Sequence, residues 1–599
     1  MKGQYSNLAY YFYIKFQESI YPSLKNSGGD PQHITELHYE DLLDFHALNY
    51  HPLNAKTFTY GPLNLISHLQ TLNESFIPFG KRTARGNSSI KQPQKLVQNE
   101  TIVLDGPFDS LNGKPISDQW KASITWKLGN PLLEEEQYNV FKWKLLSSLL
   151  CDGHNAPFYQ ELIEKRFGDD FSAHTGLDNT TAMYAFTIGV DNINEEQVSQ
   201  LDQKVKSIFQ ERVIPELKLR EKSSFHVRIE AALHQIELSL KKHKPDFGLG
   251  LLNLILPSWV NGVDPLQSLK VEEIIETFKE DYGKNGLSIF ENLIEESVCN
   301  EKVPTFKFVM KPVENFTENL AQVEETKLKQ SVSGMSEEDK DIIFSRGQEL
   351  AKKYLAKEDI SVLPTLTMQD IPREGKSYEL NFSGVNGVEG RLQKRFVSSN
   401  GLVYMTAKRD VSHIPLKFYK YIPLLTSCFT NLAGTASTPI TELETQIHRF
   451  TGGISFSCLV ATDPYDVTKA SLQFVVNGMS LKENSDHVYR LWKEILQETV
   501  WEPNEAVLDK LSTLIKSLGS NQMNAISERG HSYANSYSNA QLTSAKYLSD
   551  LFSGIEQVEF VMELNRRLDT EGKEFLKTEV LPVLRELSGL LVGGNKESQ

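Results

Sequence analysis

Histidines with nearby acidic residues are the side chains in this sequence that could bind a catalytic metal ion. Two imidazoles one helical turn apart can reach one zinc ion, and a glutamate beside them can activate the bound water. The spacings that do this are His-Glu-x-x-His and His-x-x-Glu-His, and neither occurs in the 599 residues. His33 and His38, like His46 and His51, are five residues apart, which turns the two rings of each pair toward different faces of a helix. We therefore expect these histidines to be structural, and we assign no metal ligand.

Two other groupings of polar side chains could be reactive. Glu444 and His448 are four residues apart on a predicted helix and can share a face, but no third ligand lies near them in the sequence. We interpret them as a hydrogen-bonded surface pair. Residues 530–534 place His531 beside Ser532, but neighbours in sequence do not make a catalytic triad, so we expect a turn or a packing role.

Other catalytic signatures are missing from the sequence. It contains no Gly-x-Ser-x-Gly elbow and no phosphate-binding loop. The four cysteines lie far apart, form no Cys-x-x-Cys pair and have no recognised catalytic context. They are Cys151, Cys299, Cys428 and Cys458. We assign no catalytic residue and no cofactor-binding residue, and the cysteine spacing suits a reducing or mixed compartment.

Composition and charge narrow the class of protein. A hydrophobic content of 40% and a charged content of 24% are ordinary for a folded chain, and the length predicts several domains. The formal net charge is −15, with basic residues scattered among acidic ones, so we expect no nucleic acid as a partner. Residues 249–256 form an apolar run that is far shorter than the roughly 20 residues of a membrane span. We predict a buried helix that ends at Pro257, and no membrane span.

An α/β pattern occurs twice along the chain. A strand at 122–128 precedes a helix that begins at Glu134, a second helix near Pro157, strands at 170–175 and 183–190 joined by residues 176–179, and a helix at 195–209. The second copy has a strand at 402–407, a helix around 419–431, a helix capped by Thr438 and stopped by Gly452 and Gly453, strands at 454–459 and 472–476, and a helix at 485–496. Matching elements are offset by roughly 280 residues, which predicts a duplicated module.

The segments outside these copies are mostly helical. Residues 220–349 are predicted to contain helices at 229–240, 272–282 and 315–332, and Ser336 with Asp339 indicates another helix start. A helix is also expected over residues 63–76, and residues 81–100 have the polar composition of a linker.

Several sequence blocks, in the same order along the chain, resemble the presequence proteases, a branch of the pitrilysin/insulysin superfamily of inverted-motif zinc metallopeptidases. The blocks cover essentially the whole chain. They are residues 27–31, 45–61, 146–150, 155–159, 324–330, 401–404, 451–453 and 530–534. The resemblance implies an α+β fold of repeated α/β sandwich modules, of the pitrilysin/mitochondrial processing peptidase type, joined by a helical hairpin connector.

The resemblance also implies an activity. Members are organellar zinc metalloendopeptidases that degrade cleaved targeting peptides and other short unstructured peptides in a chamber enclosed by the two halves of one chain, usually as monomers. Their zinc ligands and base glutamate come from a His-x-x-Glu-His helix and a later glutamate, which the resemblance places before Met1. The fourth domain, with its substrate-gripping Arg and Tyr, is also absent, and Arg529 with Tyr533 only mimics that pair. We therefore expect a chain truncated at both ends that binds no zinc and is inactive alone.

The alternative is a non-catalytic peptide-binding or partner subunit of the same superfamily, holding extended peptides along a sheet edge. The resemblance implies a mitochondrial location, in the matrix or intermembrane space, although residues 1–7 contain no targeting segment. A first domain that lacks half its core should fold marginally over residues 1–75 and expose residues 10–13, while residues 57–61 should form a strand.

The same resemblance sets the expected domain boundaries. They are a C-terminal remnant of a first peptidase-like domain at 1–78, a linker at 79–118, a second peptidase-like domain at 119–219, a helical connector at 220–372, and an incomplete third peptidase-like domain at 373–599.

Overall fold

The structure is a computed structural model that describes residues 2–62, 64–80, 94–110, 113–375, 377–385, 388–432 and 434–593. Residues 81–93, the centre of the predicted linker, lie outside the described residues. The chain divides into two compact units, the first formed by residues 1–316 and 402–599 and the second by residues 317–401.

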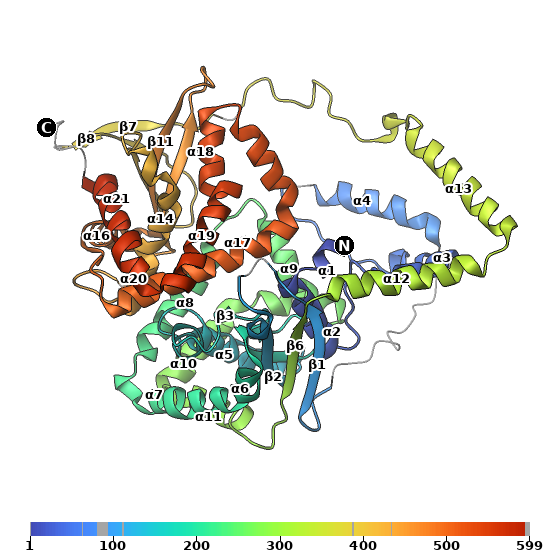
Figure 1. The fold of residues 1–599 in the computed structure, drawn as a ribbon, viewed down its shortest axis with the longest axis horizontal. Helices are drawn as coiled ribbons and strands as arrows, with labels where there is room; N and C mark the ends of the chain where they lie inside the picture. Colours follow the sequence, from blue (N-terminus) through green and yellow to red (C-terminus); the bar gives the residue numbers. More distant parts are fainter. Residues whose placement is uncertain are drawn as a thin grey trace. The chain divides into compact units, whose positions relative to one another are not determined.

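The first sheet of the larger unit contains six strands. Its order is β1-β6-β2-β5-β3, with β4 also paired to β5, and Figure 1 shows β6 lying between β1 and β2. β1 and β6 are parallel, and the remaining pairs are antiparallel. The strands are β1 (Glu100–Pro107), β2 (Trp120–Gly129), β3 (Asp170–Phe171), β4 (Gly176–Asp178), β5 (Tyr184–Ile193) and β6 (Phe306–Val313).

Both faces of this sheet are covered. On one face, Ile124, Trp126 and Phe186 pack into a core built with the helices of the module. On the other face, Phe12 from the N-terminal helix lies 5.2 Å from the Phe308 ring, and the buried hydroxyls of Thr125 and Thr187 are 2.9 Å apart. A polar pair is tolerated there because each hydroxyl has a hydrogen-bond partner. The helices around this sheet are α5 (Glu134–Cys151), a π-helix at Tyr159–Glu164, α6 (Glu195–Ile208), α7 (Ile214–Lys218), α8 (Phe225–Lys241), α10 (Val271–Asn285) and α11 (Ser288–Ser297).

The second sheet has three strands in the order β10-β11-β9, all antiparallel. Phe456, Phe474 and Met405, one from each strand, point into a second core. The helices between β9 and β10 and the helices after β11 complete that core. The elements are β9 (Leu402–Asp410), α14 (Ile422–Asn431), α15 (Ile440–Phe450), β10 (Ile454–Thr462), β11 (Ala470–Leu481), α16 (Ser485–Glu498), α17 (Glu505–Ala540), α18 (Ser544–Ser553), α19 (Ile555–Glu571), α20 (Lys573–Phe575) and α21 (Leu581–Gly593).

The two sheets confirm the predicted duplication. In the first module, β5 is paired with β2 on one side and with β3 and β4 on the other; in the second, β11 is paired in the same way with β9 and β10. The helices between these strands also correspond, since two helical segments follow the first strand and one follows the last. We refer to residues 120–218 as the first module and 402–498 as the second module. The protein is therefore an α+β protein built on a repeated unit, as expected.

Three local predictions for these modules were wrong. The residues predicted to join two strands, 176–179, include strand β4, because Gly176 to Asp178 pair with β5. The strand predicted at 170–175 is only Asp170–Phe171. Pro439 rather than Thr438 is the N-cap residue of α15. The Thr438 hydroxyl is buried and interacts with the Glu494 carboxylate, which draws it away from the helix end.

The N-terminal segment divides into a packed and an exposed part. In α2 (Leu8–Ile20), Phe12 and Phe16 are buried against β6, so the expectation that residues 10–13 are exposed holds only for Tyr13, which is 42% exposed. Residues 34–79 expose many apolar side chains, and the marginal folding expected over residues 1–75 stays a prediction. Residues 57–61 form no strand, since no described strand pairs with them. The other helices here are α1 (Lys2–Tyr5), α3 (Tyr39–Asn49) and α4 (Leu65–Phe76).

The apolar run at 249–256 lies in α9 (Phe247–Val260), and the prediction of a buried helix ending at Pro257 was wrong. The helix continues through Pro257, and Leu249 is 57% exposed. A proline costs a backbone hydrogen bond but bends a helix more often than it ends it when later turns are supported. Here the Asn261 side-chain amide donates to the Pro257 carbonyl at 2.7 Å.

The smaller unit contains two helices and a hairpin. These are α12 (Phe316–Ser333), α13 (Glu337–Leu355), and the antiparallel strands β7 (Asn381–Val385) and β8 (Val388–Lys394). The predicted helix start at Ser336 is confirmed, because the Ser336 hydroxyl accepts from the Asp339 N–H at 3.1 Å and the Asp339 carboxylate accepts from the Ser336 N–H at 3.2 Å.

Candidate functional site

Each histidine considered as a metal ligand makes a local contact. The His33 ring lies 2.9 Å from the Glu36 carboxylate, and the His46 ring stacks on Tyr50 in α3. His51 caps the short turn at Pro52, since its Nδ1 accepts from the Leu53 N–H at 3.2 Å. Within the described ranges, no group of three or more His, Cys, Asp or Glu side chains could hold a metal ion.

The cysteines are poor nucleophiles at neutral pH. Burial raises the pKa of the Cys151, Cys299 and Cys428 thiols, and it raises the pKa of Cys458 to about 12. A thiol is a nucleophile only as its thiolate, and no nearby cation lowers these values.

Polar contacts join the two modules of the larger unit between the loop after α5 and helix α15. The Glu444 carboxylate of α15 accepts from the backbone N–H of His154, in the loop after α5, at 2.8 Å. Gly153, next to it, has φ +81°, and a Cβ there would lie 2.5 Å from a Glu444 carboxylate oxygen. The loop can approach α15 so closely because this position is glycine. The predicted pairing of Glu444 with His448 was wrong, since Glu444 reaches across to the other module.

Asn155 and Arg228 extend this junction. The Asn155 amide donates to the Thr441 carbonyl at 2.6 Å, and the Arg228 guanidinium donates to the carbonyls of Asn155 at 3.1 Å and Leu149 at 2.7 Å. Burial lowers the pKa of Arg228 to about 10, although Glu444 and other carboxylates favour its charged form. A single guanidinium thereby fixes the end of α5 and the loop that touches α15.

A charged cluster from α17 lies beside this loop. The Lys510 ammonium forms an ion pair with Glu164 and lies 2.9 Å from Nδ1 of His154 and 5.6 Å from the centre of the Tyr159 ring. Burial alone would raise the pKa of Glu164, but hydrogen bonds from His154 and Lys510 outweigh it and hold the pKa below its usual value. The junction is thus a paired, hydrogen-bonded network.

Blocks 155–159 and 451–453, which carry the family resemblance, both lie at this junction. Gln235 of α8 donates to the Thr451 carbonyl at 2.8 Å, and Gly452 lies against Met479, whose methyl group would be 1.9 Å from a Cβ at that position. These blocks therefore have structural roles. Arg228, Gln235 and Lys510 were missed by the sequence analysis, because contacts between segments far apart in the sequence leave no short-range pattern.

Residues 530–534 lie inside a helix and form no turn. They belong to α17, which has non-helical dihedral angles at Arg529 (φ −122°, ψ 22°). Arg529 and His531 are exposed, and Tyr533 is half-buried. The block therefore follows a kink in the helix at Arg529. Of Arg529, His531 and Tyr533, only Tyr533 is buried enough to have the predicted packing role.

One face of the second sheet is open in part: Leu238 of α8 packs on Leu402 and Met479 there, and the rest carries exposed side chains. Thr406, Ser455 and Ser457 are exposed there, and the Thr406 hydroxyl donates to the Asn477 side chain at 2.9 Å. Tyr404 is 55% exposed and Leu459 is 44% exposed. The outer edge of β10, with the side chains of Ser455, Ser457 and Leu459 beside it, can contact an extended chain.

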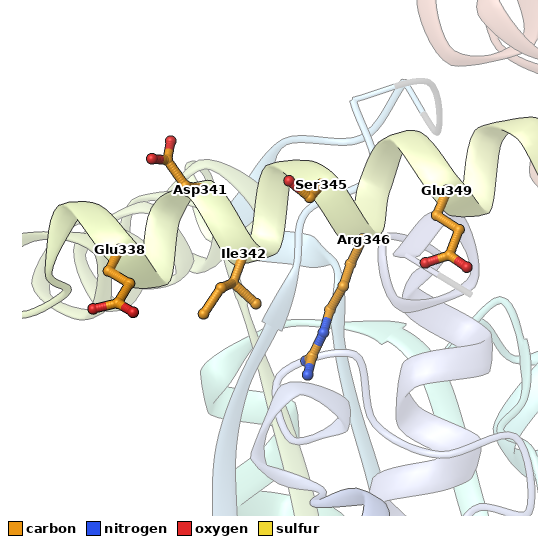
Figure 2. Close-up of a pocket in the computed structure, with 6 residues that line it drawn as sticks. All are labelled: Glu338, Asp341, Ile342, Ser345, Arg346 and Glu349. Atoms are coloured by element: carbon orange, nitrogen blue, oxygen red, sulfur yellow. The ribbon is translucent and has the colours of Figure 1, made fainter.

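The smaller unit has a shallow hollow of about 510 Å³ along α13. Figure 2 shows that all six lining side chains project from this one helix, with Ile342 and Arg346 on one side and Asp341 on the other. A hollow bounded by one exposed helix face has no second wall to hold a ligand. We assign no site to it.

Two family models match this chain. A family described as "Peptidase M16 inactive domain" matches residues 36–213, and a family described as associated with subfamily C of the same M16 peptidases matches residues 310–564. Proteins named "Presequence protease, mitochondrial" are 54% identical in Debaryomyces hansenii, 52% in Candida albicans and 39% in Saccharomyces cerevisiae. Each alignment covers 99% of this chain and 56–57% of the relative, so the chain spans about half the length of the curated relatives it matches.

Solved structures resemble the chain weakly. The crystal structure of pitrilysin is 14% identical and covers 99% of this chain and 59% of that chain with a TM-score of 0.40. A mutant of the ferredoxin protease FusC in complex with Arabidopsis ferredoxin is 11% identical and covers 91% of this chain and 56% of that chain with a TM-score of 0.37. Among the described helices, none combines the length and the apolar character that crossing a membrane requires.

Proposed function

Because the chain belongs to the M16 peptidase family, we propose that it is the non-catalytic, peptide-holding part of a mitochondrial zinc metalloendopeptidase. The substrates of that enzyme are cleaved targeting peptides and other short unstructured peptides. The observation that carries this proposal is the 54% identity over 598 residues with a protein named mitochondrial presequence protease. The net charge of −15 supports it, because an acidic surface attracts basic peptides.

The residues of this chain do not fit the zinc ion of the family. No two histidines have the spacing of either zinc-binding helix motif. His33, His46 and His51 have separate local side-chain partners, and the His38 backbone N–H donates to the Asp41 carboxylate at 3.1 Å. We therefore propose that these histidines take no part in peptide hydrolysis. The proposed task of this chain is to hold a peptide, and the junction around Glu444 supports it by fixing the open sheet of the second module against the first.

The domain boundaries form part of this proposal. They are 1–78 for the remnant of a first peptidase-like domain, 79–118 for a linker, 119–219 and 373–599 for the second and third peptidase-like domains, and 220–372 for the connector. The duplicated β-sheet topology supports the two peptidase-like domains. The predicted connector is mostly helical, although it contributes strand β6 to the first sheet.

A second candidate is a partner subunit that binds peptide beside a separate active chain. The description "inactive domain" for the family matching residues 36–213 favours it. Both candidate functions predict that the isolated chain binds peptide without hydrolysing it. They differ in whether the activity requires residues of the same polypeptide or another protein.

The test uses the purified 599-residue chain. Its zinc content is measured by elemental analysis, cleavage is followed with a fluorogenic peptide, and affinity is measured by the fluorescence anisotropy of a labelled basic peptide of about 15 residues. We expect substoichiometric zinc, no cleavage and saturable binding. Stoichiometric zinc with cleavage that a chelator abolishes, or no binding of the peptide, would contradict the proposal.

A further inference from the structure

We propose that the outer edge of β10 is the docking strand for an extended basic peptide, which adds to the second sheet as a fourth strand. This inference rests on the proposed function, since it assigns the peptide to a specific edge. Among the described strands, β10 pairs with β11 alone, over all nine residues Ile454–Thr462 in one continuous register without a bulge.

The sequence of β10 lacks the devices that usually protect an edge. Edge strands avoid pairing with other chains by being short or by carrying charges, prolines or bulges. β10 reads Ile-Ser-Phe-Ser-Cys-Leu-Val-Ala-Thr and contains no charged residue, proline or glycine. A long, regular and uncharged edge is a template for another strand.

The other sheet edges carry such devices. β1 contains Glu100, Asp105 and Pro107. β3 is two residues long, β4 is three residues long and ends in Asp178, and β9 ends in Lys408, Arg409 and Asp410. Among the described edge strands of the two sheets in the larger unit, β10 alone is long and carries no charge or proline. The uncharged edge is therefore specific to β10 and is not shared by the other edges.

Side chains beside the edge offer contacts to an added strand. On the open face, Ser455 and Ser457 are exposed and Leu459 is 44% exposed. On the core face, the partly buried Cys458 and Val460 form an apolar rim. In the loop that follows β10, Tyr465 is 98% exposed and Val467 is 63% exposed. An extended peptide with apolar side chains at alternate positions would meet apolar surface on the rim and at Leu459 and Tyr465.

Charge favours a basic peptide over a second copy of this chain. Two copies with a net charge of −15 repel each other, whereas a basic peptide is attracted. Asp463 lies directly after β10, and its side chain accepts from the backbone N–H groups of Tyr465 and Asp466 at 2.8 and 3.1 Å. An anionic group therefore stands at the end of the docking edge.

The experiment compares two variants that add the same charge to the same sheet face. Ser457→Lys places it on β10, and Thr406→Lys places it on β9, at the opposite edge. The affinity of the labelled basic peptide is measured for the wild type and both variants, with circular dichroism to verify folding. We expect Ser457→Lys to raise Kd at least fivefold and Thr406→Lys to change it less than twofold.

Two further measurements identify backbone pairing. A peptide N-methylated at alternate residues cannot donate along one edge, so we expect it to bind at least tenfold more weakly than the unmodified peptide. Hydrogen exchange should slow at 454–462 and not at 402–410 when peptide is added. Equal effects of the two variants, unchanged affinity of the methylated peptide, or protection elsewhere would overturn the inference while leaving the proposed function intact.

Sedimentation tests whether a second copy of this chain, and not a peptide, binds to the β10 edge. A concentration-dependent dimer that Ser457→Lys abolishes, with peptide affinity unchanged, would assign the edge to self-association and overturn the inference. If the wild type binds no peptide, the proposed function itself fails, which separates that outcome from failure of the edge assignment alone.

Discussion

The Glu444 carboxylate accepts a hydrogen bond from the backbone N–H of His154, 290 residues earlier in the chain, at 2.8 Å. This contact joins the helix α15 of the second module to the loop after α5 in the first. It lies among buried or half-buried groups, where a lost partner is costly because the remaining donor keeps its desolvation penalty. The junction is therefore sensitive to single substitutions.

Glu444→Ala should lower the free energy of unfolding by about 1–3 kcal/mol, because the His154 N–H is left without its acceptor. The measurement is urea unfolding at pH 7. Glu442→Ala is the control, since Glu442 is exposed on the same helix and its carboxylate accepts from the Gln446 side chain at 3.2 Å. Equal losses in the two variants would show that the Glu444 contact contributes no more than a surface hydrogen bond.

Gly153→Ala tests the close approach of the loop to α15. Gly153 has φ +81° and would place a Cβ 2.5 Å from Glu444, whereas Gly262 has φ +85° and open space around it. Both alanines should cost about 1–2 kcal/mol for the left-handed backbone. Gly153→Ala should cost measurably more in urea unfolding, because the loop must also move away from Glu444. If the two variants are equally destabilised, the steric part of the argument is wrong.

The ion pair between Lys510 and Glu164 should make stability depend on pH in the acid range. The pKa of Glu164 is held below its ordinary value of 4.5 in the folded protein. Its contribution is therefore complete above pH 4.5 and is lost as the pH falls through the folded value. Glu164→Gln should destabilise the protein at pH 7 and progressively less below pH 4.5, as measured by urea unfolding across this range.

The control for this pH dependence is a double-mutant cycle. In Lys510→Met, the partner that holds the pKa of Glu164 down is absent, so adding Glu164→Gln should have a smaller effect at pH 7. An effect of Glu164→Gln that is the same with and without Lys510 would show that the two side chains are not coupled.

Periodic segments were predictable from the sequence, and contacts between modules were not. The strand at 122–128 and the helix at 485–496 appear as β2 and α16, because alternation and helical spacing are local properties. Glu444 and His448 share a helix at the right spacing, but the preference of Glu444 for His154 depends on how the modules pack.

Two of the wrong predictions concern whether a segment finds a strand to pair with. Gly176, Leu177 and Asp178 have the composition of a turn, yet they form β4 because β5 offers them an unpaired edge. Residues 57–61 have the composition of a strand, but no described strand pairs with them. Strand formation requires a neighbouring strand to pair with, and the composition of a segment does not reveal that neighbour. The predictions for these two segments were therefore wrong.

The N-terminal helix α2 offers the sharpest test of how the first module is covered. Phe12 is fully buried against Phe308, whereas its neighbour Tyr13 is 42% exposed and stacks on His174 at 4.3 Å. Phe12→Ala should cost about 3–5 kcal/mol by leaving a cavity on the sheet, and Tyr13→Ala about 1 kcal/mol or less. Urea unfolding followed by the fluorescence of Trp126 and the other tryptophans gives both values.

Limited proteolysis extends this test to residues 34–79. Their exposed apolar side chains contribute little burial, so cleavage there should precede cleavage within 8–21 in the wild type. Phe12→Ala should expose residues 8–21 to cleavage as well, because α2 loses its largest contact with the sheet, while Tyr13→Ala should leave the order of cleavage unchanged. Equal protection of 8–21 and 34–79 in the wild type would mean that the exposed segment is held by contacts stronger than its burial indicates.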